Sequence, residues 1–304
     1  MLSSTRESAT SETSGSARPF RALSHGAIGL RRVARHRGAI VGAFLIGGLL
    51  LGALLAPYVT RYDPNAPHFD LRLQPPSAAF PLGTDSFGRD IMSRLAYGGR
   101  ISLTVGAISV ILSFAVGVPL GIAAGYYGGR LDDVIMRAVD VWLAFPGLLL
   151  AIGIVAVLGP GLFQIMIAVG VTSIPIFARL IRGSILSQRE ADFVLAARSV
   201  GVPRRSILAS HILPNSISPV IVQGTLSLAT AIIDVAGLAF LGLGDPDPSR
   251  PEWGAMLTNT NEYLQVAPFL AIIPGIAIVI SALGFNLIGD ALREALDPKL
   301  RGRA

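Results

Sequence analysis

The sequence predicts an all-α protein that crosses a membrane several times. Of its 304 residues, 52% are hydrophobic and only 14% are charged, a composition too apolar for a soluble domain. The apolar residues gather in long stretches, each near the roughly 20 residues that a helix needs to span a bilayer. Six such stretches predict six transmembrane helices, at about 38–58, 101–125, 134–158, 162–182, 215–243 and 266–289.

The basic residues predict the orientation of these helices. If the N-terminus is inside, 19 of the 25 basic residues lie on the cytoplasmic side. This excess favours cytoplasmic positions for both termini. The arginines cluster beside apolar stretches, so the net charge of +6 indicates membrane topology, and we expect contact with lipid and none with nucleic acid.

The first part of the chain predicts a tail, one span and a long outer loop. Residues 1–37 are rich in Ser and Thr and then in arginine, which predicts a disordered basic cytoplasmic tail. The apolar run that follows is longer than that of a signal peptide, so we expect an uncleaved first span. Together with the proline-rich extracytoplasmic loop at 59–100, this span makes up a region at 38–100.

The end of the outer loop contains several glycines and a short amphipathic pattern. Gly83, Gly88, Gly98 and Gly99 permit tight turns. Residues 90–96 predict either a helix lying along the outer interface or part of a structural cap.

The remaining five spans form the domain that we place at 101–304. Gly117, Gly121 and Gly125 recur at every fourth residue of the second span, which favours close helix packing. Prolines at 119, 146, 175 and 274 lie within spans and predict kinks or breaks.

The polar loop between the fourth and fifth spans, at about 184–214, contains an unusual apolar stripe. Phe193, Ala197 and Val200 are spaced to share one helical face. Gly201 stands where a C′ glycine ends a helix, and Pro203 where a first-turn proline begins the next. The pattern predicts either a plug for a partner's groove or an ordinary loop packed on its own bundle.

Two acidic residues interrupt the spans. Asp234, near the bilayer centre, costs about 2.5–3.5 kcal/mol on insertion scales, so it should face the bundle interior or a water-filled cavity. It either pairs within the bundle and stabilises the fold or lines a translocation path. We expect Asp140 near the inner boundary, where Arg137 can pair with it on one helical face.

Several kinds of chemistry are missing from the sequence. There are no cysteines, so disulfides and Cys-based metal sites are excluded. No P-loop, H-E-x-x-H or G-x-S-x-G motif occurs, and the four histidines lack metal-ligand spacing. We therefore expect no catalytic residue, cofactor or metal site in this chain.

The polar loop at about 184–214 resembles the EAA loop of ABC-importer membrane subunits, which docks into the ATPase. Ala196, Ala197, Gly201, Leu213 and Pro214 match that pattern, whereas Leu195 stands where the family has glutamate. The departure changes one polar contact, and docking is still implied. The implied coupling residues are Glu190, Phe193, Leu195, Ala196, Ala197, Gly201, Pro203, Leu213 and Pro214.

Four further segments are similar to permeases of the dipeptide/oligopeptide/nickel importer group. They are residues 81–103, 126–152, 240–257 and 290–303. The resemblance implies a type I ABC importer permease fold in a bacterial cell membrane, and a family that usually has glutamate at the position of Asp234. It also implies four kinds of partner: a second homologous permease, two ABC ATPases that hold ATP and Mg, an extracytoplasmic binding protein and lipid.

We therefore expect a permease subunit that forms half of the path for dipeptides or oligopeptides. Nickel or another small solute remains an alternative cargo. A rival from a different class is an ion-coupled secondary transporter with Asp234 as its proton site. An intramembrane enzyme is a third class, but the sequence offers no nucleophile–base or metal constellation for it.

Overall fold

The computed structural model describes residue 33 and residues 36–258 and 260–296. Most of the predicted tail at 1–37, and the end of the chain from residue 297, therefore lie outside the described residues.

Helices dominate the described part of the chain, as predicted, and it contains no strand beyond an isolated bridge between Thr84 and Asp90. The longer helices are α2 (Arg37–Leu54), α4 (Ile91–Tyr127), α5 (Gly129–Leu143), α6 (Gly147–Leu158), α7 (Leu162–Arg189), α11 (Ser218–Leu238) and α13 (Phe269–Leu296). The shorter ones are α3 (Ala56–Val59), η1 (Phe69–Leu71), α8 (Asp192–Ser199), α9 (Arg204–Ile207), η2 (Leu208–Ile212), α10 (Leu213–Ser216), η3 (Ala239–Leu243), α12 (Trp253–Leu257) and η4 (Thr260–Tyr263).

Five helices of the described residues are long and apolar enough to cross a membrane: α2, α4, α7, α11 continued through η3, and α13. The pair α5 and α6 makes a sixth if it counts as one span, although it is bent by 90°. The stretch predicted as one span at 134–158 is therefore two helices with a sharp bend between them. Pro146 precedes α6 with extended backbone, and a proline both lacks an N–H and disfavours helix at the residue before it.

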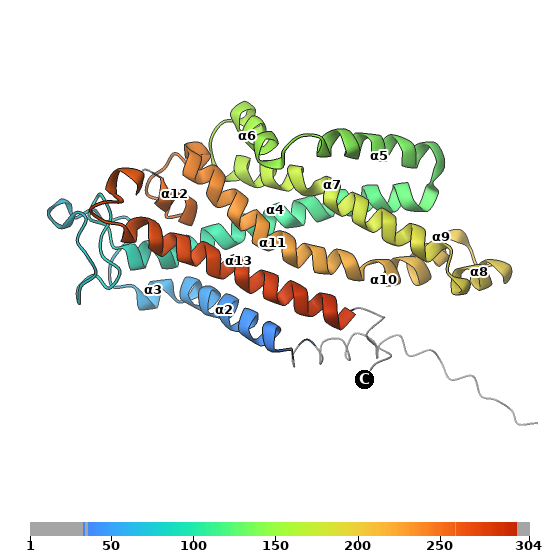
Figure 1. Cartoon of the computed structure of the whole chain (residues 1–304), viewed down its shortest axis with the longest axis horizontal. Helices are drawn as coiled ribbons and strands as arrows, with labels where there is room; N and C mark the ends of the chain where they lie inside the picture. The colour runs from blue at the N-terminus through green and yellow to red at the C-terminus, as the bar shows by residue number, and fades with distance from the viewer. Residues whose placement is uncertain (1–32, 34–35, 259, 297–304) are drawn as a thin grey trace, which may run out of the picture.

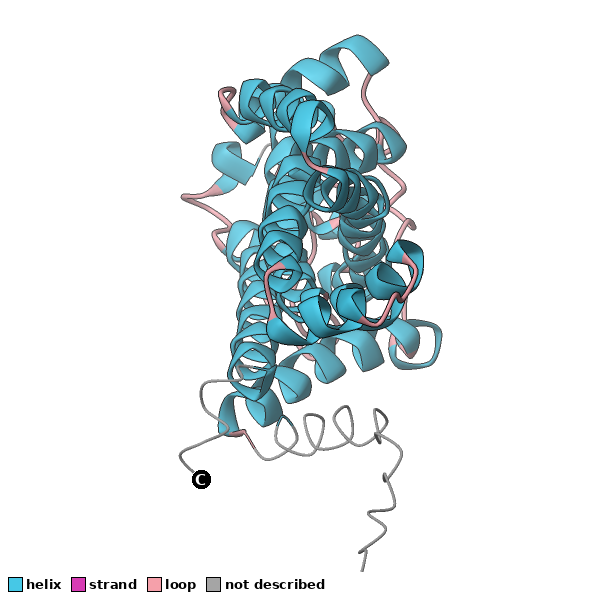
Figure 2. Ribbon diagram, turned by 90° about the vertical axis from the view of Figure 1, so that its right-hand side faces the viewer, coloured by secondary structure: helices cyan, strands magenta, loops and turns pink. Residues whose placement is uncertain are grey.

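The long helices lie side by side in one bundle (Figures 1 and 2). Helix α4 packs along α7, α11 packs against α13, and α13 packs against α2, while α5 and α6 lie on the outer side of α7 (Figure 1). The predicted glycine packing is confirmed. A Cβ at Gly117 would lie 2.6 Å from the carbonyl oxygen of Ile174, so the α4 and α7 backbones touch there.

The outer end of α4 differs from the prediction. Residues 90–96 do not form a separate interfacial helix, because α4 begins at Ile91 and continues into the bundle. Asp90 caps it by accepting a hydrogen bond from the Ser93 N–H at 2.9 Å. The boundary that we placed between residues 100 and 101 consequently falls inside α4.

Two glycines expected in turns lie within this helix instead. A Cβ at Gly98 would be 3.1 Å from the carbonyl oxygen of Pro251, and one at Gly99 would be 3.1 Å from the Trp253 ring. Their lack of a side chain lets the segment around Trp253 pack on α4. This contact joins α4 to the segment at the start of α12.

Candidate functional site

The loop between α7 and α11 folds into short helices. Helix α8 ends at Ser199, and Gly201 follows with φ +78°. The Gly201 N–H bonds the Arg198 carbonyl at 3.0 Å, which closes the helix end as predicted. Nothing lies within 4 Å of a Cβ built on Gly201, so the backbone angle, and not lack of space, requires glycine. Pro203 is the N-cap of α9 and not a first-turn residue.

The two faces of α8 have different environments. Val194 and Ala197 are 0% and 8% exposed and pack with the core, so Ala197 does not share the open face that we predicted. Phe193 and Val200 are 41% and 79% exposed, and Ala196 lies between them on the same side. The loop therefore both packs on its own bundle and presents a small apolar surface to the outside.

The other implied coupling residues lie elsewhere along the loop. Leu195 and Pro203 are exposed, and Glu190 is exposed at the C-cap of α7. Leu213 and Pro214 begin α10, with Leu213 half-buried and Pro214 exposed.

Two hydrogen-bonded links attach this loop to α4. The Tyr126 hydroxyl donates to the Arg204 carbonyl oxygen at 2.6 Å. Arg189 donates to the carbonyl oxygens of Gly125 and Tyr126 at 2.9 and 3.3 Å. Sequence reasoning missed both, and the only available signal was an arginine at the end of a span.

Asp234 lies in the C-terminal half of α11 and is half-buried. No described residue forms an ion pair or hydrogen bond with its carboxylate. The alternative in which a partner within the bundle neutralises Asp234 therefore has no support among the described residues.

Asp140 pairs with Arg179 of α7, with an Nη2–Oδ1 distance of 2.5 Å, and not with Arg137 as predicted. The pair between Arg182 and Asp132 is bidentate, at 2.9 and 2.6 Å. Both arginines reach from α7 to α5, so ion pairs hold α5 against the bundle.

A groove with a volume of about 690 Å³ lies among the end of α5, the C-terminal half of α7 and the start of α11. Most of its surface is apolar, and polar groups come from Arg179, Ser184, Ser187 and Gln188 of α7 and from Gln223 of α11. The lining residues are Leu143, Ile176, Arg179, Leu180, Gly183, Ser184, Ser187, Gln188, Pro219 and Gln223.

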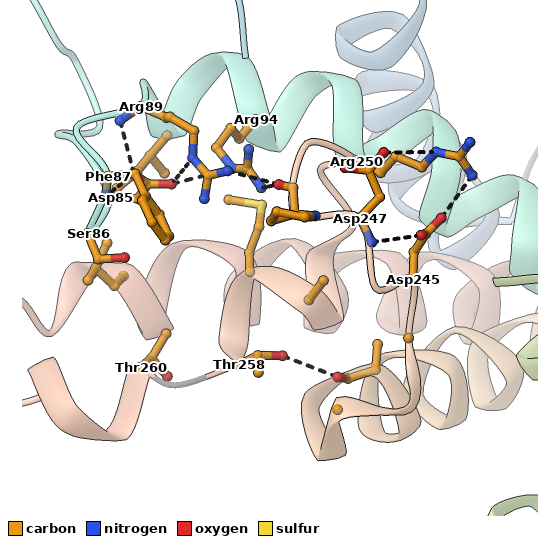
Figure 3. A pocket seen from close by; sticks show the side chains of 18 of the residues that line it. Asp85, Ser86, Phe87, Arg89, Arg94, Asp245, Asp247, Arg250, Thr258 and Thr260 are labelled. Atoms are coloured by element: carbon orange, nitrogen blue, oxygen red, sulfur yellow. Dashed lines mark hydrogen bonds and ion pairs between the residues drawn. The ribbon is translucent and has the colours of Figure 1, made fainter. Parts of the chain in front are cut away.

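A second pocket, of about 400 Å³, lies between the two outer loops (Figure 3). Asp85 accepts a hydrogen bond from Arg89 at 2.7 Å and lies 3.6 Å from Arg94. Both arginines donate to the carbonyl oxygen of Pro248, at 2.8 and 3.3 Å (Figure 3). The cluster of Asp85, Arg89 and Arg94 thereby fastens the first outer loop to the second.

Glu252 is a buried acid that sequence reasoning overlooked. It caps α12 by accepting from the N–H groups of Gly254 and Ala255, at 3.0 and 2.8 Å. It also accepts from the Ser102 hydroxyl on α4 at 3.0 Å. Burial raises the pKa of Glu252, while the hydrogen bonds oppose that rise.

Comparison with protein families finds two matches. Residues 117–302 match the binding-protein-dependent transport system inner membrane component. Residues 26–76 match the N-terminal transmembrane domain of oligopeptide transport permease C.

Curated relatives extend over most of the chain. It is 46% identical to the dipeptide transport system permease protein DppC of Alkalihalophilus pseudofirmus, covering 89% of each chain. It is 44% identical to the di/tripeptide transport system permease protein DppC of Pseudomonas aeruginosa, covering 89% of this chain and 91% of the relative. It is 45% identical to the glutathione transport system permease protein GsiD of Pectobacterium atrosepticum, covering 89% and 90%.

A solved structure shares the fold. A chain of the MetNI methionine ABC transporter, in an inward-facing conformation, superposes with a TM-score of 0.57 at 18% identity. The match covers 68% of this chain and 98% of the other. The predicted type I importer fold is therefore supported by an independent structure.

Proposed function

Because this chain belongs to the family of binding-protein-dependent transport system inner membrane components, we propose that it is the permease subunit of an ATP-driven importer for dipeptides and related short peptides. The observation that carries the proposal is identity of 44–46% to peptide permeases over 89% of the chain. The test is uptake of labelled dialanine by cells with and without the gene. Loss of uptake on deletion, restored by the intact gene, is the expected result.

The coupling of ATP hydrolysis to transport is assigned to the loop that contains α8. The exposed apolar face formed by Phe193, Ala196 and Val200 is suited to a groove on an ABC ATPase. Two such ATPases supply the ATP and Mg chemistry, and this chain provides no nucleotide motif of its own. Closure of the ATPases then moves the helices of the permease as rigid bodies.

The remaining partners follow from the proposed orientation. With both termini in the cytoplasm, the loops that contain Arg89 and Pro248 face outward and form a cap for the binding protein. A second homologous permease completes the translocation path. The first 37 residues form a cytoplasmic tail, and the region that contains α4–α13 forms the permease domain.

We assign Asp234 to the translocation path. Its carboxylate has no partner among the described residues, and a lipid-facing position would be costly. A carboxylate in a low-dielectric path attracts the amino terminus of a peptide.

Peptides are favoured over nickel because the relatives described above are named for peptide or glutathione transport. A secondary transporter that uses Asp234 is disfavoured because the family is named for systems that depend on a binding protein.

A further inference from the structure

One face of α11 is polar although the helix is otherwise apolar. Gln223, Ser227, Thr230 and Asp234 are spaced at i, i+4, i+7 and i+11, so they share that face. Local hydrogen bonds connect three of them: Gln223 donates to the Ser227 hydroxyl at 3.2 Å, and Thr230 donates to the Ser227 carbonyl at 3.1 Å. These four residues form the polar face of α11.

Two other sides of α11 are closed by packing. Val220, Val235 and Leu238 belong to the main core with residues of α4 and α7. Ile232 packs in a second cluster with Trp253 of α12 and residues of α13. Along the polar face, by contrast, Thr230 is exposed, Gln223 and Asp234 are half-buried, and only Ser227 is buried.

Lipid is a poor neighbour for this face. An ionisable side chain within a span faces the bundle interior or a water-filled cavity, because its exposure to hydrocarbon costs about 2.5–3.5 kcal/mol. Asp234 has no described partner that would neutralise it. The polar face therefore borders an aqueous space or a polar partner.

The polar face continues into the inner groove. Gln223 belongs to both, and Ser184, Ser187 and Gln188 extend the polar lining along α7. A Cβ on Gly183 would meet nothing within 4 Å, so the groove is open there. Its volume of about 690 Å³ is within the range of small-molecule sites.

We propose that the polar face of α11 and the α7 side of the groove form one continuous binding track for a short peptide. The amide and hydroxyl groups bond the peptide backbone, and Asp234 holds its free amino group. This inference rests on the proposed function and assigns the residues that contact the cargo.

The chemistry of the track matches cargo with varied side chains. Hydroxyl and amide groups offer donors and acceptors that any peptide backbone can use. Arg179, the charged residue of the groove, is already paired with Asp140. Asp234 and Gln223 are eleven residues apart, about 16 Å along a helix, which is roughly the length of five extended residues. A dipeptide therefore occupies part of the track at a time.

Single cysteines test this inference cleanly, because the chain has no natural cysteine. The variants are Gln223→Cys and Thr230→Cys on the track. The controls are Ile221→Cys, on the opposite side of α11, and Val279→Cys on α13, where valine is 64% exposed on an apolar surface. Inside-out vesicles that contain the full importer are treated with a small charged thiol reagent, with and without dialanine.

The two track thiols should react, and the two control thiols should not. Dialanine at ten times its dissociation constant should slow the reaction of Thr230→Cys about tenfold by occupancy. It should protect Gln223→Cys less, because a dipeptide held at Asp234 is too short to reach Gln223. N-acetyl-dialanine, which lacks the amino group, should protect Thr230→Cys less well than dialanine does, because Thr230 is one turn from Asp234.

If the track thiols do not react in an assembled importer, the inference that these residues line a binding track is wrong, even if dialanine uptake is normal. A reactive Thr230→Cys that dialanine does not protect would overturn the peptide assignment. Failure of the proposed function gives a different result, because the unmodified importer would then fail to take up dialanine in cells.

Discussion

The Tyr126 hydroxyl donates a hydrogen bond of 2.6 Å to the carbonyl oxygen of Arg204. The bond joins the last turn of α4 to the first residue of α9, so movement of the coupling loop acts directly on a helix that runs to the outer loops. Tyr126→Phe should therefore reduce dialanine uptake per ATP hydrolysed, and the lost bond should cost about 1 kcal/mol of stability.

Tyr127→Phe is the matched control for this change. Tyr127 is the next residue, it is 71% exposed, and its hydroxyl forms no hydrogen bond with a described residue. The two variants are compared by uptake and ATP hydrolysis in the same proteoliposomes. Equal coupling ratios for both would contradict the role of Tyr126.

Gly201→Asp should leave membrane insertion intact and abolish transport. It places a side chain at φ +78° and a charge at the end of the helix that presents the docking surface. Gly201→Asn is the control, since asparagine tolerates this conformation and adds no charge. Co-purification of the ATPases and uptake are the measurements, and normal values for the Asp variant would refute docking through this loop.

Accessible cysteines at Ser77 and Ser210 test the orientation. Both serines are exposed, and they lie in the first outer loop and the coupling loop. An impermeant thiol reagent should label Ser77→Cys in whole cells, and should label Ser210→Cys only after permeabilisation. The reverse pattern would exclude cytoplasmic termini.

Asp234→Asn should slow the uptake of cationic peptides more than that of anionic peptides, because it removes charge and keeps size. Asp234→Leu should still assemble with its partners, since loss of an uncompensated charge is tolerated. Competition between lysine- and glutamate-containing dipeptides provides the measurement. Unchanged selectivity in the Asn variant would reject attraction by Asp234, and failure of the Leu variant to assemble would favour a structural role.

Burial raises the pKa of Glu252 above its ordinary value of 4.5. The stability contributed by this shift is complete below the ordinary pKa and is lost as pH rises through the raised value. The melting temperature of the importer should therefore contain a component that falls over this interval. Glu252→Gln should remove it, whereas Gln at the exposed Glu262 should not. Parallel pH profiles for the wild type and both variants would contradict the assignment.

Span positions and the glycine that follows α8 were predictable because they depend on local sequence. Apolar length identified the spans, and the C′ position identified Gly201. The break predicted at Pro146 is present, but its 90° size was not predictable, because the apolar composition continues on both sides of Pro146. Asp90 was not recognised as the cap that starts α4, because Gly98 and Gly99 read as turn signals.

The contacts of the candidate site were less predictable, because they join distant segments. Asp140 pairs with Arg179, 39 residues away, and not with Arg137 on its own helix. Ala197 is buried because the bundle covers one side of α8. Helical spacing alone does not predict which side is covered. In the sequence Glu252 resembles any acidic residue of a loop, because its contact with Ser102, 150 residues away, appears only in the structure.

The most direct test of the proposed function is uptake of labelled dialanine by proteoliposomes that contain this chain, its partner permease and their ATPases. With the binding protein outside, accumulation should require ATP and should stop when either ATP or the binding protein is omitted. Accumulation driven by an imposed proton gradient, without ATPases, would contradict the account and restore the secondary transporter.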